Sequence, residues 1–224
     1  MQEKNTWGHL TKSEYMKYTC HSGGCPGADM EWERQGEKYG IKTIAYSFHG
    51  HVQEGKNPVI LMSNELDEGW EHVLIAEKTL KRKVENISST YVRSLLCRNW
   101  FQVKNSDAIF AIGKLETAST LSGGTGWAVQ MAIDNKKPVY IFDQTPWSEE
   151  WMKECPKLWS YFNYDVNSFI PTLYGVKLTK NFAGIGTRDL NDIGRYAIEH
   201  TYRENFPEYD LTPAAKDDTI LSNE

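Results

Sequence analysis

The 224-residue sequence lacks the features that would place a protein in a membrane or outside the cell. No apolar run approaches the ~20 residues that a membrane-spanning helix needs, and the first residues show no leader-like pattern of a basic start, an apolar stretch and a small-residue cleavage site. Four cysteines are present without a CxxC spacing, so we expect reduced thiols rather than disulfides. These absences predict a cytoplasmic protein with no membrane partner, in the host cytoplasm if it is viral.

The sequence also lacks a basic stripe. Its net charge is −5, and its lysines and arginines are interspersed with acidic residues, so a nucleic-acid partner is disfavoured. A small anionic ligand is still allowed, because backbone amides and one or two arginines in a pocket can attract an anion even when the net charge of the protein is negative. No repeat or low-complexity tract interrupts the chain, and we predict one domain over residues 1–206 and a flexible tail over residues 207–224.

Short apolar runs alternate with helical patterns along the chain. The predicted strands are Tyr15–Cys20, Lys42–Tyr46, Ala108–Gly113, Pro138–Asp143 and Asn181–Gly186. The predicted helices are Asp29–Tyr39, Trp70–Val84, Thr90–Lys104, Gly126–Asn135 and Leu190–Asn205, with Ser88 or Ser89 as the N-cap of the third. This alternation predicts an α/β, Rossmann-like fold with a mainly parallel sheet covered by helices on both faces.

The segment over residues 145–164 is rich in tryptophan, tyrosine and phenylalanine. It fits an insertion or lid better than a strand of the sheet. Such aromatic side chains can stack on a base, although plain packing is the commoner role of large aromatics.

Three glycine-rich turns follow predicted strands. Glycines allow positive φ and let a ligand approach the bare backbone, and a helix start directs free amides at an anion. The residues of these turns that we expect to bind a ligand are Ser22, Gly23, Gly24, Gly27, Asp29, Gly123, Gly124, Thr125, Gly126, Gly184, Gly186, Thr187 and Arg188. Close packing explains any one such turn equally well, but three turns at the carboxyl edge of one parallel sheet predict a phosphate pocket.

Two of these turns resemble a known superfamily, the SLOG group of Rossmann-like nucleotide binders. Residues 22–29 resemble its YpsA-type "SGGxxGAD" turn, and residues 184–188 resemble the "GSR" turn that normally opens the domain. The reversed order is that of a circular permutation. The sequence therefore resembles the circularly permuted YpsA-like family, some of whose members are labelled molybdenum carriers, over about residues 15–205.

A comparison with the related Lonely Guy phosphoribohydrolases and the DprA core is also informative. Arg98, residues 106–109 and the turn over residues 123–126 resemble the Lonely Guy pattern, which implies that Arg98 binds the ligand. The glutamate of that pattern falls on Gln130 and its threonine on Trp127. Because an amide cannot carry the charge of a carboxylate, the resemblance implies binding more strongly than N-glycosidic hydrolysis.

Other reactive residues have several interpretations. His49, His51, Cys20 and Cys25 do not have the spacing of a zinc site, so no metal site is expected, although both histidines could line the pocket. Cys20 and Cys25 lie near a helix start, which would favour a thiolate. No partner base can be named, so a buried, unreactive thiol fits these cysteines better. Asp29 could cap its own helix, contact a ribose hydroxyl or act as a general base, which makes it a weak catalytic candidate.

We therefore expect a protein that binds a nucleotide or a nucleotide-derived signal, such as an ADP-ribose-like molecule, for sensing, carriage or sequestration. No cofactor is required for that role. The alternatives are a nucleotide N-glycosidic hydrolase and an adaptor whose cleft is vestigial. An exposed aromatic face would also suit a homodimer or higher homo-oligomer.

Overall fold

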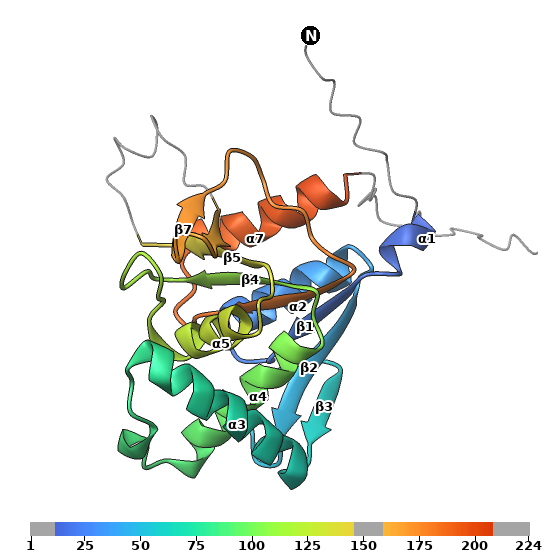
Figure 1. Cartoon of the computed structure of the whole chain (residues 1–224). Coiled ribbons are helices and arrows are strands. Elements are labelled where there is room, and N and C mark those ends of the chain that lie inside the picture. The colour runs from blue at the N-terminus through green and yellow to red at the C-terminus, as the bar shows by residue number, and fades with distance from the viewer. Residues whose placement is uncertain (1–11, 146–158, 208–224) are drawn as a thin grey trace, which may run out of the picture.

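The computed structural model describes residues 12–145 and 159–207. Within these ranges the strands form one eight-stranded sheet in the order β3-β2-β1-β8-β4-β5-β6-β7 (Figure 1). The strands are β1 (Thr19–Ser22), β2 (Lys42–Phe48), β3 (Pro58–Leu61), β4 (Ala108–Gly113), β5 (Val139–Asp143), β6 (Ser160–Asn163), β7 (Ser168–Pro171) and β8 (Asn181–Gly186). The helices are α1 (Lys12–Tyr15), α2 (Ala28–Lys38), α3 (Ser63–Leu80), the 3-10 turn η1 (Val84–Asn86), α4 (Thr90–Lys104), α5 (Gly123–Asp134) and α7 (Asp192–Asn205).

The sheet is mainly parallel, as predicted. All pairs from β3 across to β5 are parallel, and only the β5–β6 and β6–β7 pairs are antiparallel. Every residue of β4 is buried, because helices cover both faces of this inner strand. The last strand of the chain, β8, lies between β1 and β4 at the centre of the sheet.

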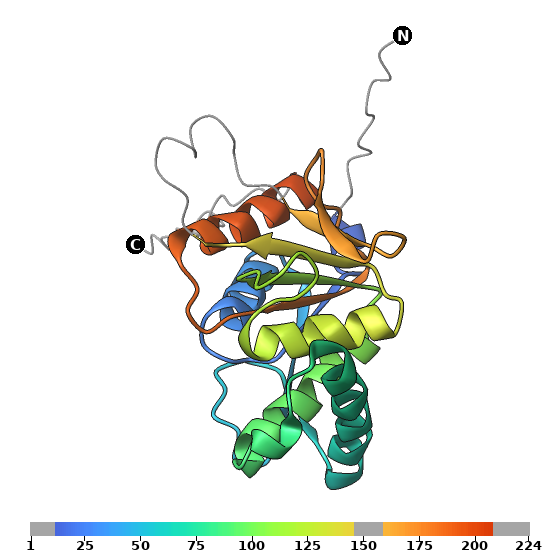
Figure 2. The same ribbon diagram turned by 60° about the vertical axis from the view of Figure 1, so that its left-hand side comes forward.

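Helices cover both faces of the sheet, which confirms the predicted Rossmann-like α/β architecture. Helices α2 and α7 pack together on one face, and α4 and α5 lie on the other (Figure 2). Helix α3 packs outside α4 and α5 and forms a further layer. In the described part of the chain, none of these helices has both the length and the apolar character to cross a membrane.

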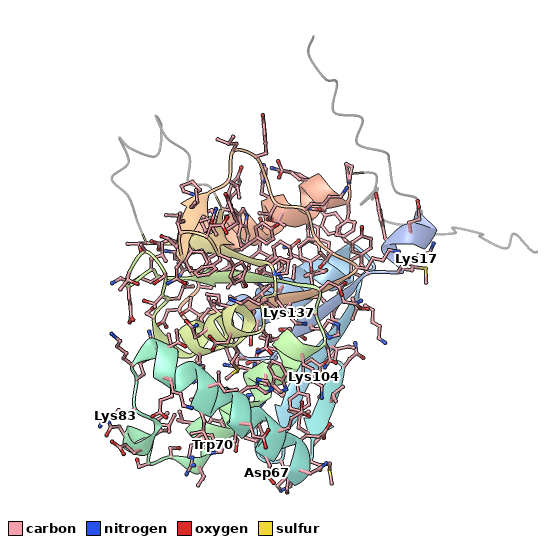
Figure 3. The ribbon with its side chains drawn as sticks, viewed as in Figure 1. Lys17, Asp67, Trp70, Lys83, Lys104 and Lys137 are labelled. Carbon is pink, nitrogen blue, oxygen red and sulfur yellow. The ribbon has the colours of Figure 1, made fainter. Side chains whose placement is uncertain are left out.

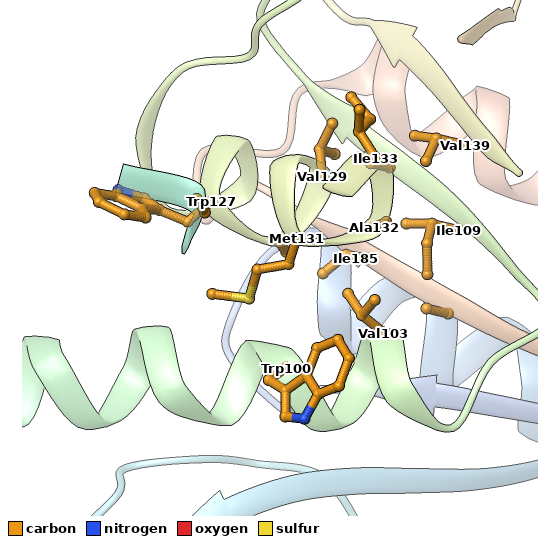
Figure 4. Close-up of a cluster of buried hydrophobic side chains, with 14 of the residues drawn as sticks. Trp100, Val103, Ile109, Trp127, Val129, Met131, Ala132, Ile133, Val139 and Ile185 are labelled. Atoms are coloured by element: carbon orange, nitrogen blue, oxygen red, sulfur yellow. The ribbon is translucent and has the colours of Figure 1, made fainter. Parts of the chain in front are cut away.

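Each face of the sheet carries its own hydrophobic core. Figure 4 shows part of the core beneath α4 and α5, where Trp100 and Val103 of α4 lie close to Met131 of α5. Outside this core, the Glu68 carboxylate of α3 accepts hydrogen bonds from Trp100 Nε1 at 2.8 Å and Lys104 Nζ at 2.7 Å. Figure 3 shows Lys104 at the end of α4, beside α3. These contacts fix α4, which carries Arg98.

The predicted first strand is wrong in its position. Residues 12–15 form a helical turn, and the strand begins at Thr19. Tyr15 is buried because its ring packs edge-on against Phe206, with 5.0 Å between centroids, and not because it lies in a strand. A buried aromatic in a one-turn helix looks the same in sequence as one in a strand.

The third helix and the edge strand also differ from expectation. Helix α3 starts at Ser63, seven residues before the predicted Trp70, and ends at Leu80, where Lys81 takes the left-handed conformation with φ of 55°. Its first turn is polar, so the apolar pattern missed it. Strand β3 was missed because it is short, begins with a proline and leaves Val59 and Ile60 exposed at the edge of the sheet.

The aromatic segment predicted as an insertion or lid contains a strand of the sheet. Residues 160–163 form β6, in which Tyr161 is exposed and Phe162 is buried, as expected for alternating faces. Trp159, just before β6, packs against Phe142 with 5.6 Å between ring centroids. The remainder of the lid prediction, residues 146–158, and the tail prediction beyond residue 207 lie outside the described residues.

Candidate functional site

A cleft of about 390 Å³ lies at the carboxyl ends of the central strands. The chain leaves β1 towards β2 and leaves β4 towards β5, in opposite directions across the sheet, and this divergence opens a crevice at such a switch point. The cleft is lined by Cys25, Asp29, Val92, Leu95, Leu96, Arg98, Asn99, Ser122, Gly123, Gly124, Thr125, Ile185, Gly186, Thr187 and Arg188. The lining of the cleft therefore includes both polar and aliphatic residues.

The N-terminus of α5 forms the polar floor of the cleft. Gly123 has a φ of 63°, and nothing lies within 4 Å of the position that a Cβ would take on Gly123 or Gly124. The Ser122 side chain does not cap the helix, and no hydrogen bond within the described ranges uses the backbone N–H groups of Gly123, Gly124 or Thr125. These amides and the positive end of the helix dipole are available to an anion.

A buried ion pair lies beside this floor. Arg98 and Asp29 have side chains that are 4% exposed, with 3.4 Å between Arg98 Nη1 and Asp29 Oδ2. Arg98 Nη1 also donates to Gln102 Oε1 at 2.8 Å, whereas its Nε–H has no acceptor among the described residues. Burial raises the pKa of the Asp29 carboxyl, against the lowering effect of Arg98.

Asp29 joins the first glycine turn to the third. It is the second residue of α2, and its Oδ1 accepts the backbone N–H of Gly186 at 3.1 Å. The helix has no side-chain cap, so the capping role considered for Asp29 is wrong. The carboxylate instead binds the end of β8, 157 positions along the chain.

The third glycine turn does not lead directly into a helix, which corrects the predicted start at Leu190. Helix α7 begins at Asp192, and the Asn191 side chain caps it by accepting the N–H of Gly194 at 3.0 Å. Thr187 and Arg188 therefore lie in a loop, where Arg188 is exposed beside the cleft.

The other predicted ligand residues do not line the cleft and instead contact protein atoms around it. Ser22 donates from its hydroxyl to the Asp29 carbonyl at 3.1 Å, and a Cβ on Gly23 would lie 1.5 Å from Arg98 Nη1. The remaining glycines pack against protein atoms: Gly24 against Gln53, Gly27 against the Thr187 and Arg188 carbonyls, Gly126 against the Leu121 carbonyl, and Gly184 against Trp32. These positions allow close packing that supports the cleft.

Residues that distinguish this chain from the Lonely Guy pattern do not line the cleft. Gln130 is buried and donates from Nε2 to Asp134 Oδ1 at 2.9 Å, and Trp127 belongs to the hydrophobic core. His49 lies at a different hollow, between β3 and α4. Within residues 12–145 and 159–207, no three His, Cys, Asp or Glu side chains gather as a metal-holding group.

Asn99 and Cys25 are among the lining residues that sequence reasoning did not place at the cleft. Asn99, next to Arg98 on α4, donates from Nδ2 to the Gly124 carbonyl at 3.3 Å. Cys25 lines the cleft with its Sγ 3.4 Å from His51 Nε2, a contact between residues 26 positions apart. No local pattern reveals either contact, because each depends on two elements meeting in space.

Comparisons with known proteins give one structural likeness. No family model matches the chain, and no curated protein matches it. A crystal structure from Syntrophus aciditrophicus SB, of a protein provisionally named a molybdenum carrier, aligns with 18% identity and a TM-score of 0.41. The alignment covers 84% of this chain and 93% of that protein.

Proposed function

We propose that the cleft binds a nucleotide or nucleotide-derived molecule through its phosphate, in a sensing, carrying or sequestering role. The unpartnered N–H groups at the start of α5 carry this proposal, because the first amides of a helix without a side-chain cap, together with the positive end of its dipole, attract an anion. Arg98 and Arg188 add positive charge at the same cleft. A bound phosphate would supply acceptors for the amides and charge for the arginines.

The aliphatic residues of the lining support a ligand with a ring. Val92, Leu95, Leu96 and Ile185 line the cleft, and Val92 is 40% exposed. A volume of about 390 Å³ lies within the ~300–1,000 Å³ typical of small-molecule sites. A molecule that carries both a phosphate and a base matches this mixture of polar and aliphatic lining, and ADP-ribose is one such molecule.

The chain order supports the proposed relation to the circularly permuted YpsA-like family. In the family that the sequence resembles, the "GSR" strand opens the domain, whereas here the corresponding β8 is the last of the described strands and still lies at the sheet centre, between β1 and β4. A solved relative with the unpermuted order, superposing strand by strand on this sheet, would establish the permutation. A failure of β8 to match its opening strand would reject it.

Gly124→Val tests the binding proposal directly. The new side chain would meet no protein atom within 4 Å of its Cβ, so the fold should persist while the methyl groups cover the α5 amides. We expect affinity for the best ligand among nucleoside monophosphates, nucleoside diphosphates and ADP-ribose to fall by about tenfold or more, which is 1.4 kcal/mol. Isothermal titration calorimetry measures this change.

Asn64→Val is the matched control, because Asn64 occupies the same second position in α3, is exposed and does not line the cleft. Equal loss of affinity in the two variants, or no binding by any phosphate ligand, would reject the proposal. Gly23→Val is less suitable, since its side chain would displace the buried Arg98 guanidinium and disturb the fold itself.

A second function, N-glycosidic hydrolysis, is favoured by one observation. Asp29 is a buried carboxyl at the cleft whose pKa is raised by burial, and a raised pKa is a shift in the direction that a general acid needs. Release of free base from the bound nucleotide, lost in Asp29→Asn, would support this function. Binding without base release would reject hydrolysis and support the binding function. No binding at all would favour an adaptor with a vestigial cleft.

A further inference from the structure

A cysteine and a histidine from separate loops meet at the cleft wall. Cys25, in the loop between β1 and α2, lines the cleft, and its Sγ lies 3.4 Å from Nε2 of His51, which follows β2. His51 Nδ1 lies 3.1 Å from the hydroxyl oxygen of the buried Ser47. The His51 ring also stacks on Phe48, with 4.9 Å between centroids and 13° between planes.

This geometry gives a nucleophile, a base and a group that orients the base. A neutral His51 with its proton on Nδ1 donates to Ser47 and turns the Nε2 lone pair towards the Cys25 thiol. Ser47 thus acts as a positioning residue. Cysteine nucleophiles in enzymes are commonly activated by such a paired imidazole.

Two arginines and one carboxylate surround Cys25. Arg98 Nη2 donates to Cys25 Sγ at 3.1 Å, and Arg188 also lies near the thiol. Burial raises the pKa of the Cys25 thiol, Arg98 and Arg188 lower it, and the Asp29 carboxylate raises it. Burial and the same two arginines lower the pKa of His51 to about 4, so the ligand-free pair is a neutral thiol beside a neutral imidazole.

An anion in the cleft would change this balance. By offsetting the charge of Arg98 and Arg188, it would remove part of the penalty on a protonated His51. The imidazole could then accept the thiol proton. Ligand binding itself would therefore activate the pair.

We propose that Cys25 and His51 hydrolyse a phosphate monoester held in the cleft, an activity that rests on the proposed binding of a phosphate ligand there. Cys25 Sγ attacks phosphorus, the S–P bond forms, and the bond from phosphorus to the ester oxygen breaks. His51 takes the thiol proton, and the leaving alcohol, which departs on the far side of phosphorus from Sγ, takes a proton from solvent. Water then attacks phosphorus from that far side and gives a proton to solvent. Inorganic phosphate is released, and the departing thiolate takes its proton back from His51.

The test is release of inorganic phosphate from para-nitrophenyl phosphate, ribose 5-phosphate and the nucleoside 5′-monophosphates, with binding of each measured separately. We expect turnover by the natural sequence, with Cys25→Ser and His51→Gln slower by roughly 100-fold or more. Cys25→Ser should keep its affinity for the substrate. Mass spectrometry of the quenched protein should show one phosphoryl group on Cys25.

Matched controls separate this chemistry from damage to the fold. Cys97→Ser removes another buried thiol, in α4, and His49→Gln removes an exposed imidazole two residues from His51; both should retain turnover. Binding without phosphate release, or full turnover by Cys25→Ser, would overturn the proposal and leave the binding function intact. Absence of binding by every monoester would overturn the hydrolysis proposal, and the binding proposal would fall with it only if nucleoside diphosphates and ADP-ribose also failed to bind.

Discussion

At the scale of single residues, glycine serves two opposite purposes around the cleft. A Cβ on Gly27 would lie 2.4 Å from the Arg188 carbonyl oxygen and 2.5 Å from that of Thr187, so this glycine exists for close packing. A Cβ on Gly123 or Gly124 would have no protein atom within 4 Å, so the backbone of these two glycines is open to a ligand. The same residue type thus builds the support of the cleft in one turn and its accessible floor in another.

Gly27→Ala is expected to destabilise the protein by about 3 kcal/mol or more. Gly27 has a φ of 97°, a conformation that costs a residue with a Cβ roughly 1–3 kcal/mol, and the two carbonyl contacts add to that cost. Urea unfolding measures the change. Gly124→Ala, where space is open, should stay within about 0.5 kcal/mol of the natural sequence. Equal stabilities of the two variants would contradict this account.

At the scale of elements, the start of α5 differs from the starts of α4 and α7. The Ser89 hydroxyl caps α4 by accepting the N–H of Val92 at 3.3 Å, and Asn191 caps α7 in the same manner. Ser122 occupies the corresponding position of α5 but makes no such bond. Since capping side chains satisfy the first amides of a helix, their absence at α5 keeps those amides available.

Ser89→Ala should lower the free energy of unfolding by about 1 kcal/mol, because the first turn of α4 loses the acceptor for an amide. Thermal or urea unfolding checks this value. Ser88→Ala is the control: Ser88 is exposed, lies outside the helix and should change stability by less than about 0.5 kcal/mol. A larger effect at Ser88 than at Ser89 would show that the cap is assigned to the wrong residue.

At the scale of the whole molecule, a buried acid makes stability depend on pH. Glu33 of α2 is 1% exposed, and neither carboxylate oxygen has a hydrogen-bond partner among the described residues. Burial raises the pKa of Glu33 from 4.5 to about 7, and the nearby Ser22 and Gly24 offset this only in part. Between these two values, the folded state holds a proton that the unfolded state releases. The stability contributed by Glu33 therefore falls as pH rises from 4.5 through 7.

Glu33→Gln should remove that dependence. Relative to the natural sequence, the variant should gain stability as pH rises from 4.5 to 8, by up to about 3 kcal/mol at 1.36 kcal/mol per pKa unit. Urea unfolding across this pH range measures the difference. Glu37→Gln, one turn further along α2 where the side chain pairs with Lys56 at the surface, should show no comparable gain. Parallel pH profiles for both variants would contradict the assignment.

The fold class and much of the cleft follow from the amino-acid sequence alone. The apolar runs at residues 108–113 and 181–186 are buried on both faces, so their composition alone identifies inner parallel strands, and strand ends followed by glycines identify the edge where the cleft lies. Of the predicted ligand residues, the cleft is lined by Asp29, Arg98, Gly123, Gly124, Thr125, Gly186, Thr187 and Arg188.

Contacts between distant parts of the chain establish which glycines face the cleft and which side chains meet there. Gly27 and Gly124 carry similar local signals, yet one packs against carbonyl oxygens and the other is open, because their neighbours come from distant parts of the chain. The pairing of Cys25 with His51 likewise arises from two loops that parallel strands bring to one edge of the sheet. Local sequence determines backbone conformation, whereas contacts across the sheet edge depend on strand order, which no local pattern encodes.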